Sequence, residues 1–399
     1  MRILHVVTAF PRTTGDVIVP WLVELLHRLQ ADGHEVEVFT SAYQGLGDQV
    51  IEGLPVHRFR YSIRRWENLT HEETAPDRVR RSLFYGVLSV AFVLSGTVAI
   101  WRLCRRHPFD IIHVHWPMPL ALWGWAAQAA CGAPVVTTFY GVELRWVKRS
   151  LPFLKGFVRW AARRSARIVA ISSHTAEELR EFTDRVVEVI PYGSAVAPRP
   201  LGQRARAEDG PFEVLFVGRL VQRKGVSVLI DAMARIHARV PVHLSIVGAG
   251  PERSRLEAQV GRLALEREVE FWGQVPASRL LEAYSKANVF VLPAVEDARG
   301  DTEGLGVVLL EAMSHGVPVV GSRIGGIVDI VIQDETGLLV PPADADALAS
   351  AIRALAENPA LAERLGQGGR RHVGQHFSWE TVTKKWNMVY RSCHRATAP

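Results

Sequence analysis

The stretch EGLGVVLLEAMSHGVPVV, residues 303–320, reads as a loop, a helix and a strand in succession. Its loop, Gly304-Leu305-Gly306, is expected to open a helix at Val307 that continues through Glu311. The N–H groups of such a loop and of a helix N-terminus form an anion site. Beside that site, a carboxylate at Glu303 can accept hydrogen bonds from sugar hydroxyls, and one at Glu311 from ribose hydroxyls. The structural alternatives are a Glu303 that favours the helix dipole and a Glu311 that is an exposed helix acid.

A second strand-to-loop junction carries positive charge. The strand expected at residues 213–217 ends in Gly218-Arg219-Leu220, and Lys224-Gly225 follows. A glycine at position 218 lets a ligand approach the backbone. Arg219 and Lys224 then offer two cations at the end of the strand, which suits a diphosphate. The alternative is a solvated basic turn, which this spacing taken alone would favour.

Short apolar runs alternate with helical patterns along the whole chain. The order strand–helix–strand requires crossover connections and predicts parallel sheets. Strands are expected at residues 3–8, 35–40, 111–115, 135–139, 168–171 and 186–190, and again at 213–217, 243–247, 268–271, 289–292 and 317–320. The fold class is therefore α/β, with two Rossmann-like, doubly wound domains facing a central cleft. Ligands of such sheets bind beyond the carboxyl ends of the strands.

The domain boundaries follow from composition. Residues 194–211, SAVAPRPLGQRARAEDGP, are rich in Pro, Gly, Ala and Arg and form the expected linker. This places one domain at residues 1–196 and a second at residues 210–376. The tail at residues 377–399 is expected to form a helix that packs back on the first domain, because apolar residues recur in it near helical spacing. These residues are Phe377, Trp379, Val382, Trp386 and Tyr390.

Composition and charge limit the possible partners. The chain has 399 residues, a net charge of +6 and a pI near 9.4. This excess suits nucleotide phosphates or a membrane surface, while no nucleic-acid-binding module is recognisable, so no nucleic-acid partner is expected. The three cysteines lack zinc-site spacing, and their odd number suggests a reducing compartment. Because no signal-peptide pattern precedes the first strand, the expected location is the cytoplasm.

Two segments raise the question of a membrane. Residues 83–101, LFYGVLSVAFVLSGTVAIW, carry no charge and are flanked by arginines on both sides. We expect a buried helix here, apolar all round because it is covered; a membrane span or an in-plane membrane contact is the alternative. Residues 148–167 contain seven cations and no acid, and Lys155, Arg159, Arg163 and Arg167 recur every four residues. Such a stripe suits an anionic bilayer, and a solvated face is the alternative.

Three further patterns are weaker signals. Residues 248–253, GAGPER, resemble a dinucleotide fingerprint, but Arg253 occupies the third glycine position. Asp344 and Asp346 resemble a metal-binding pair, but they open a helix, so capping is the better interpretation. His113 and His115 alternate at a strand end and are as well explained by core histidines as by contact with a substrate.

Taken together and in order, these motifs resemble glycosyltransferase family 4, whose members have the GT-B fold. The resemblance covers nearly the whole chain. It is carried by Gly218-Arg219-Leu220 with Lys224-Gly225, by Glu303 and Glu311, and by the following Gly316-Val317-Pro318-Val319-Val320. It implies a hexosyl transfer from a nucleotide-sugar, such as a UDP-sugar, with retention of anomeric configuration and with neither a cofactor nor a metal. The first domain would then lie on the acceptor side and the second on the donor side.

The resemblance also assigns roles to residues. Arg219 and Lys224 would neutralise the donor diphosphate, Glu303 would contact the donor sugar, and these three form the expected catalytic set. Glu311 would contact the ribose, and the backbone near Val275 the base. The remaining donor-binding positions would be Gly218, Gly304, Leu305, Gly306 and Val307.

The first domain departs from the family pattern at its sugar-side motif. The usual motif begins with His, whereas this chain has Tyr140-Gly141-Val142-Glu143. The loop at residues 11–16 also lacks the usual double glycine, which leaves Gly15 as a backbone contact. The expected function is transfer of a sugar to a lipid-linked or polysaccharide-precursor saccharide. Such an acceptor would bring the enzyme to the inner face of the cell membrane as a peripheral protein. The alternatives are a non-catalytic nucleotide-sugar-binding protein and an epimerase or phosphorylase of the same fold.

Overall fold

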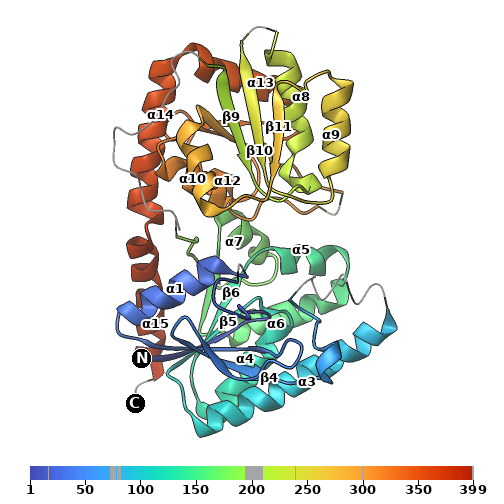
Figure 1. Ribbon diagram of the computed structural model, residues 1–399. Helices are drawn as coiled ribbons and strands as arrows, with labels where there is room; N and C mark the ends of the chain where they lie inside the picture. Colours follow the sequence, from blue (N-terminus) through green and yellow to red (C-terminus); the bar gives the residue numbers. More distant parts are fainter. Residues whose placement is uncertain are drawn as a thin grey trace. The chain divides into compact units, whose positions relative to one another are not determined.

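The chain folds into two compact units. The structure is a computed structural model that describes residues 1–16, 18–71, 78, 82–193, 210–238, 240–298 and 300–397. The first unit comprises Met1–Ile171, Thr175–Gly193 and Val382–Pro399, and the second comprises Ser172–His174 and Ser194–Thr381 (Figure 1). Most of the expected linker, residues 194–209, lies outside the described residues.

The first unit is built on an eight-stranded sheet with the order β3-β4-β2-β1-β5-β6-β7-β8. All neighbouring strands are parallel except β3 and β4, which form an antiparallel pair. The central strands are buried throughout, as expected for a parallel sheet covered on both faces. The strands are β1 Arg2–Val6, β2 Glu35–Ser41, β3 Gln49–Ile51, β4 Leu54–Phe59, β5 Ile111–His115, β6 Val135–Phe139, β7 Arg167–Ala170 and β8 Val187–Val189.

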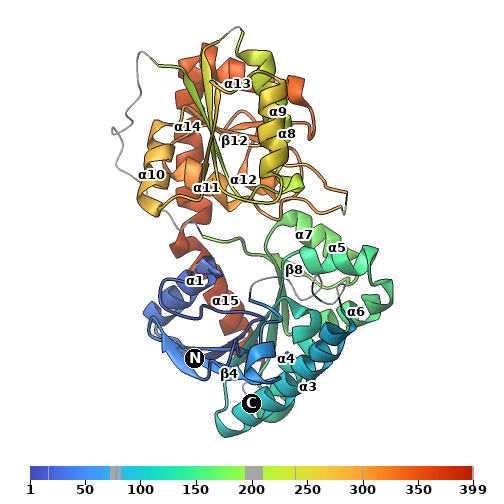
Figure 2. The same ribbon diagram turned by 45° about the vertical axis from the view of Figure 1, so that its right-hand side comes forward.

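Helices cover both faces of this sheet (Figure 2). They are α1 Pro20–Ala31, α3 Leu83–Arg106, α4 Pro117–Cys131, α5 Val142–Arg149, α6 Lys155–Arg164, α7 Ser173–Arg180 and α15 Trp379–Thr397, with short 3-10 turns at Arg64–Trp66 and Pro152–Leu154.

The C-terminal helix α15 packs on the first unit, as expected from its apolar spacing. Asn387 lies 2.6 Å from the Nε2 atom of His34 and donates a hydrogen bond to Asp32. The Tyr390 hydroxyl lies 2.8 Å from Nδ1 of the buried His113, and the Trp386 ring packs on the same imidazole. The last helix of the chain therefore completes the core of the first unit.

Helix α3 differs from the sequence expectation. Its buried residues form one line along the helix, from Leu88 and Phe92 through Gly96 and Ile100 to Cys104. Only 22% of its most apolar 18-residue window is buried, and it is the only described helix long and apolar enough to cross a membrane. The prediction of a helix covered all round is therefore wrong, because one face packs on the core and the other is exposed.

The second unit is a six-stranded parallel sheet with the order β11-β10-β9-β12-β13-β14. Helices α8 and α9 lie on one face of this sheet, and α10 and α14 on the other (Figure 2). The strands are β9 Phe212–Val217, β10 Val242–Val247, β11 Val269–Gly273, β12 Val289–Leu292, β13 Val319–Ser322 and β14 Leu338–Val340. The helices are α8 Val226–Ile236, α9 Arg253–Arg262, α10 Ala277–Lys286, α11 Val307–Ser314, α12 Ile327–Ile330, α13 Ala345–Glu357 and α14 Pro359–His372, with a 3-10 turn at Gln222–Lys224 and a π turn at Val373–Phe377.

Helix α13 begins at a side-chain cap. The Asp344 carboxylate accepts hydrogen bonds from the backbone N–H groups of Asp346 and Ala347, at 3.1 and 2.8 Å. Asp346 pairs instead with Arg235 on helix α8, at 2.7 Å. The two carboxylates therefore have separate structural partners, and the capping interpretation is confirmed for Asp344.

Candidate functional site

The loops at the carboxyl ends of the second unit's strands pack backbone against backbone. A Cβ atom at Gly248, after β10, would lie 2.0 Å from the carbonyl oxygen of Gly218, after β9. A Cβ atom at Gly326 would lie 2.2 Å from the carbonyl oxygen of Gly304, and the Gly326 N–H donates to the Glu303 carbonyl at 3.0 Å. Because glycine alone fits these approaches, the sequence fixes the loops that carry the predicted anion site.

Three charged side chains meet at this edge. The Lys224 Nζ atom lies 2.5 Å from Oε2 of Glu303, and Arg223 donates to the same oxygen at 3.3 Å. Lys224 and Glu303 are both buried, with exposed fractions of 9% and 8%. The structure therefore brings together two of the three predicted catalytic residues, 79 positions apart in sequence. It adds Arg223, which the sequence analysis missed because a third cation in a basic turn is indistinguishable from a solvated one.

Glu303 is held as a carboxylate. Burial would raise its pKa, but the charges of Lys224 and Arg223 outweigh that effect and hold the pKa below its usual range. Arg223 also lies 3.7 Å from Asp301. The site thus presents an ammonium and a guanidinium group within hydrogen-bonding distance of the same carboxylate, and the ammonium and the carboxylate are buried.

Arg219 follows Gly218 at the end of β9 and is exposed. Its carbonyl oxygen accepts a hydrogen bond from the Val221 N–H at 2.9 Å, but its side chain forms no hydrogen bond and no ion pair among the residues that the structure describes. Its guanidinium is therefore free to bind an anionic ligand, whereas the Lys224 ammonium is already engaged.

Helix α11 begins where the sequence predicted. Gly306 adopts a left-handed conformation, with φ of 91°, immediately before the first helical residue, Val307. Leu305 is buried, and its N–H contributes to lowering the pKa of Glu303. The loop from Gly304 onward therefore places the N-terminus of α11 shortly after Glu303 in the sequence, and a helix N-terminus is a common anion site.

Glu311 is not the exposed helix acid of the structural alternative. Its side chain is half-buried and accepts a hydrogen bond from the hydroxyl of Tyr284, on α10, at 2.7 Å. Burial raises its pKa, and the Tyr284 hydrogen bond opposes that rise. Val275 lies just beyond β11, the edge strand of the sheet, and is half-exposed.

In the first unit, Gly15 lies in an exposed loop and adopts a positive φ of 81°. An ion pair between Arg12 and Asp16, with N and O 2.7 Å apart, closes this loop, and the Gly15 N–H donates to Glu52 at 3.3 Å. The backbone around Gly15 is therefore ordered by charged side chains.

Tyr140, in the position of the usual histidine, is buried at the end of β6. Its hydroxyl lies 2.6 Å from Nδ1 of His115, and its N–H donates to the Glu143 carboxylate at 2.7 Å. Burial raises the pKa of Glu143 to about 7. Gly141 has a φ of 87°, and a Cβ atom there would lie 2.8 Å from the Arg145 guanidinium. The motif is thus a tightly packed turn.

His113 and His115 are core histidines. They lie with His5 in a buried group of ring nitrogens within 4.8 Å of one another. His113 is held by Tyr390 and by Thr138, while His115 is held by Tyr140 and by His5, 3.0 Å away. Hydrogen bonds therefore occupy both nitrogens of each predicted histidine, and this donor set does not fit a metal site. Burial lowers the pKa of His115 to about 3, so the ring is neutral.

The sequence matches two models of glycosyltransferases. Residues 20–194 match "Glycosyltransferase Family 4", and residues 202–372 match "Glycosyl transferases group 1". The chain is 30% identical, over 99% of its length and 95% of the relative's, to a glycogen synthase of Mycobacterium tuberculosis. It is 32% identical, over 70% of its length and 76% of the relative's, to a GDP-mannose-dependent alpha-(1-6)-phosphatidylinositol monomannoside mannosyltransferase of Mycolicibacterium smegmatis.

Solved structures agree with this relationship. A sucrose-phosphate synthase from Thermosynechococcus elongatus superposes with a TM-score of 0.78 at 27% identity, covering 99% of this chain and all of that one. An Anabaena protein crystallised with UDP and glucose superposes with a TM-score of 0.71 at 19% identity, covering 98% of this chain, and shows the shared fold. The chain therefore belongs to glycosyltransferase family 4, has the GT-B fold, and is an enzyme of the glycosyltransferase class.

Proposed function

We propose that this enzyme transfers a hexose from a nucleotide-diphosphate sugar to a saccharide or lipid-linked acceptor, with retention of anomeric configuration and without a metal. The observation that carries the proposal is the cluster of Lys224, Arg223 and Glu303 beside the start of helix α11. A diphosphate needs fixed positive charge and backbone donors, and this edge of the sheet offers both.

The Lys224 ammonium can serve the diphosphate without losing Glu303. An ammonium has three N–H donors, and the contact with Glu303 uses one of them. The remaining donors, together with Arg219 and the N–H groups from Gly304 onward, would hold the phosphate oxygens. Charge that builds on the leaving diphosphate as the glycosidic bond breaks is then stabilised by groups already in place.

Glu303 is suited to the donor sugar rather than to proton transfer. Its lowered pKa makes it a poor general acid at neutral pH, while an ionised carboxylate is a strong acceptor for sugar hydroxyls. Glu311 would accept from the ribose, and the backbone near Val275 would meet the base. We expect no metal requirement, since the Lys224 ammonium, the Arg219 guanidinium and the N-terminus of α11 would take the place of a divalent ion at the diphosphate.

We place the acceptor contacts in the first unit, and the names of the relatives indicate which classes of acceptor to consider. One relative acts, by its name, on a phosphatidylinositol monomannoside, and another is a glycogen synthase, so both lipid-linked and polysaccharide acceptors occur among similar proteins. Gly15 and the turn Tyr140-Gly141 with Glu143 are the proposed contacts with the acceptor or the transferred sugar. A lipid-linked acceptor would place the enzyme at the inner face of the cell membrane, as a peripheral protein reached from the cytoplasm.

Product analysis with radiolabelled nucleotide-sugars and a panel of saccharide and lipid-linked acceptors tests the proposal. A labelled glycoside with the donor's anomeric configuration supports it. Donor binding without product across the panel would favour the non-catalytic alternative, and conversion of the donor alone to an isomeric sugar nucleotide would favour an epimerase.

A further inference from the structure

An unbroken row of apolar side chains is exposed along helix α3. Successive members are four, three, four, four and three residues apart, which places them on one face of the helix. Their exposed fractions run from 92% at the first to 40% at the last. The row consists of Leu83, Val87, Val90, Leu94, Val98 and Trp101 and is called here the α3 stripe. Isolated exposed apolar residues are ordinary, but a continuous row of this length calls for a partner.

The opposite face of α3 fixes the helix along the protein surface. The buried line from Leu88 to Cys104 runs nearly its whole length and joins the core of the first unit. At Gly96 the helix backbone approaches the Trp123 ring so closely that a Cβ atom would lie 2.4 Å from it. A helix held in this way cannot pass through a bilayer without the domain, so the stripe can meet a membrane only with the helix axis in the membrane plane.

The polar groups of α3 do not oppose contact with lipid. The Ser89 and Thr97 hydroxyls donate to backbone carbonyls one turn earlier, at 2.8 Å each. No charged residue occurs from Leu83 to Trp101. The exposed face of the helix therefore presents mainly hydrocarbon, and the Ser89 and Thr97 hydroxyls, already hydrogen-bonded within the helix, would be desolvated at little cost.

Cations and aromatic rings flank the stripe at both ends. After Trp101 come Arg102, Arg105 and Arg106, all exposed, and none forms an ion pair with a described residue. The Arg105 guanidinium lies 4.8 Å from the Trp101 ring centre. At the other end, Trp66 packs edge-on against Phe84, with ring centres 5.0 Å apart, and the exposed Arg65 guanidinium lies 4.9 Å from the Trp66 ring centre. Aromatic rings and arginines at the borders of an apolar surface are typical of a membrane interface.

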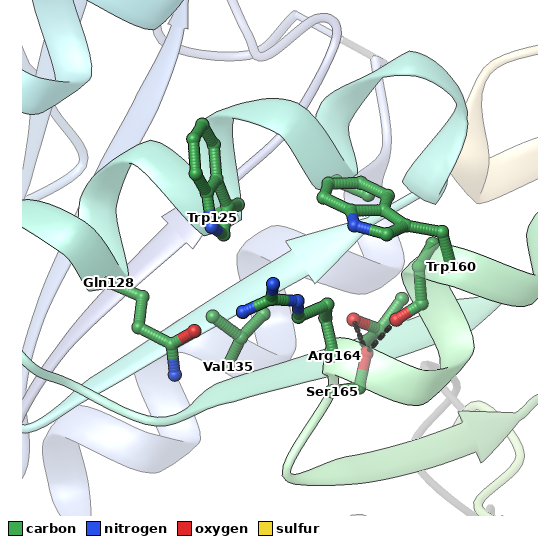
Figure 3. A pocket seen from close by; sticks show the side chains of 9 residues that line it. Trp125, Gln128, Val135, Trp160, Arg164 and Ser165 are labelled. Carbon is green, nitrogen blue, oxygen red and sulfur yellow. Dashed lines mark hydrogen bonds between the residues drawn. The ribbon is translucent and has the colours of Figure 1, made fainter. Parts of the chain in front are cut away.

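The neighbouring helices α4 and α6 carry further aromatic and basic side chains. Helix α4 packs between α3 and α6, and a shallow hollow lies between α4 and α6. Trp125 and Trp160 flank the Arg164 side chain in that hollow (Figure 3). Arg159 and Arg163 on α6 are likewise exposed and form no ion pair within the described part of the chain.

The fourth member of the predicted basic stripe does not belong to this surface. Helix α6 ends at Arg164, so Arg167 is the first residue of β7, where it pairs with Glu188 at 3.5 Å. Lys148, on α5, is also engaged, by Glu181 at 2.6 Å. The prediction of a single helical stripe through Arg167 is therefore wrong. Within the described residues, Arg159 and Arg163 on α6 and the three arginines that end α3 have no ion-pair partner.

We propose that the α3 stripe inserts, in plane, into the surface of an anionic bilayer, and that the arginines of α3 and α6 bind its headgroups. This inference deepens the proposed function, because it names the surface by which an enzyme with a lipid-linked acceptor would reach its substrate. Charge selects lipid over a second copy of the chain, since both ends of the stripe are basic and self-association would place cations near cations.

Flotation of the full-length protein with vesicles tests this surface. The vesicles are phosphatidylcholine, alone or with about one third phosphatidylglycerol. Val90→Glu combined with Leu94→Glu replaces exposed side chains and should lower the partition coefficient at least about tenfold at every salt concentration. The matched control is Met388→Glu, since Met388 is as exposed as Val90 but lies on α15, and it should bind as the unmodified protein does.

Charge reversal separates the two contributions. Arg102→Glu with Arg105→Glu should reduce binding at least about thirtyfold at low salt, at roughly 1 kcal/mol for each cation lost, and should have little effect at high salt. Unchanged binding of the Val90/Leu94 variant, or no binding of the unmodified protein to the anionic vesicles, would overturn the proposal. A dimer in solution that the same variant dissociates would also overturn it and assign the stripe to self-association.

Transfer to a water-soluble saccharide, assayed in parallel, distinguishes the two proposals. If that activity persists in the Val90/Leu94 variant while vesicle binding is lost, both the docking surface and the transferase function are supported. If vesicle binding behaves as expected but no donor and acceptor pair gives product, the proposed function fails and the docking surface stands.

Discussion

Replacing Lys224 with alanine should harm both catalysis and stability, and the structure separates the two effects. In the unliganded protein the ammonium lies 2.5 Å from the Glu303 carboxylate, and both groups are buried. Lys224→Ala leaves Glu303 with Arg223, 3.3 Å away, as its remaining cationic partner. The variant therefore removes a contact to the donor and also unpairs a buried carboxylate.

The magnitudes follow from these contacts. Losing one transition-state charge contact should lower turnover by about two to three orders of magnitude. Removing one partner of a buried pair costs about 3–5 kcal/mol, and the lower end applies because Arg223 remains. For a domain of this size, about 3 kcal/mol corresponds to a fall of roughly 6–12 °C in the midpoint of thermal unfolding.

The pH dependence gives a further check on the same variant. In the unmodified protein the folded-state pKa of Glu303 lies below its usual value of 4.5. Its ionisation therefore stabilises the fold above about pH 4.5, and this stabilisation is lost as the pH falls through the folded-state pKa. The stability difference between the protein and Lys224→Ala should accordingly be largest at neutral pH and shrink in acid.

Arg219→Ala is the matched control, because the Arg219 side chain is exposed and has no partner among the described residues. It should lose turnover to a similar extent but keep the unfolding midpoint within about 2 °C. The assays are steady-state transfer kinetics and calorimetric unfolding, both of the full-length protein, with the unfolding transition of the second domain compared between variants. Near-normal kinetics in both variants would refute the diphosphate assignment, and equal midpoints for both would refute the account of the buried pair.

Three other outcomes are expected. Transfer should survive excess EDTA; a loss that magnesium or manganese restores would contradict this and redirect attention to Asp344 and Asp346. Gly326→Ala should weaken donor binding in calorimetric titration, since its Cβ atom would lie 2.2 Å from the Gly304 carbonyl oxygen and displace the anion loop; unchanged affinity would count against that loop. The pKa of His115 is lowered to about 3, so its contribution to stability should be complete above about pH 6.5 and fall as the pH drops toward 3; His115→Asn should flatten this dependence in denaturant titrations, and an unchanged slope would contradict it.

The strands whose predicted bounds match the structure are buried along their whole length. The strands at residues 111–115, 135–139 and 289–292 were predicted to the residue, because a central parallel strand is apolar on both faces. The missed strands are β3, β4 and β14, which lie at or next to sheet edges. They are short or half-polar, and Pro55 interrupts the apolar pattern of β4. These strands form because a neighbouring strand pairs with them, and the local sequence pattern carries no information about that neighbour.

The part of the candidate site that could be predicted is the part whose sequence motif has few other structural explanations. Glu303 followed by a glycine loop and a helix pointed to an anion site, and the structure places it against Lys224. Arg223 and Tyr284 were missed for different reasons. Arg223 looked like any cation in a basic turn. The contact between Tyr284 and Glu311 joins two residues that lie on different helices, 27 positions apart in the sequence. Helix α3 was misjudged because an all-apolar segment has the same periodicity whether one face or both are covered.

The resting charge balance of the site bears on how the donor is recognised. Lys224 and Arg223 are offset by Glu303 and Asp301, so this cluster carries no net charge before the donor arrives. Net attraction for a diphosphate must then come from Arg219 and the N-terminus of α11. The buried pair has a different part in catalysis, because its ammonium is already desolvated and fixed by Glu303. The negative charge that develops on the leaving diphosphate is therefore stabilised by a cation that does not have to move or lose water during the reaction. Under this condition a cation stabilises the transition state more than the ground state.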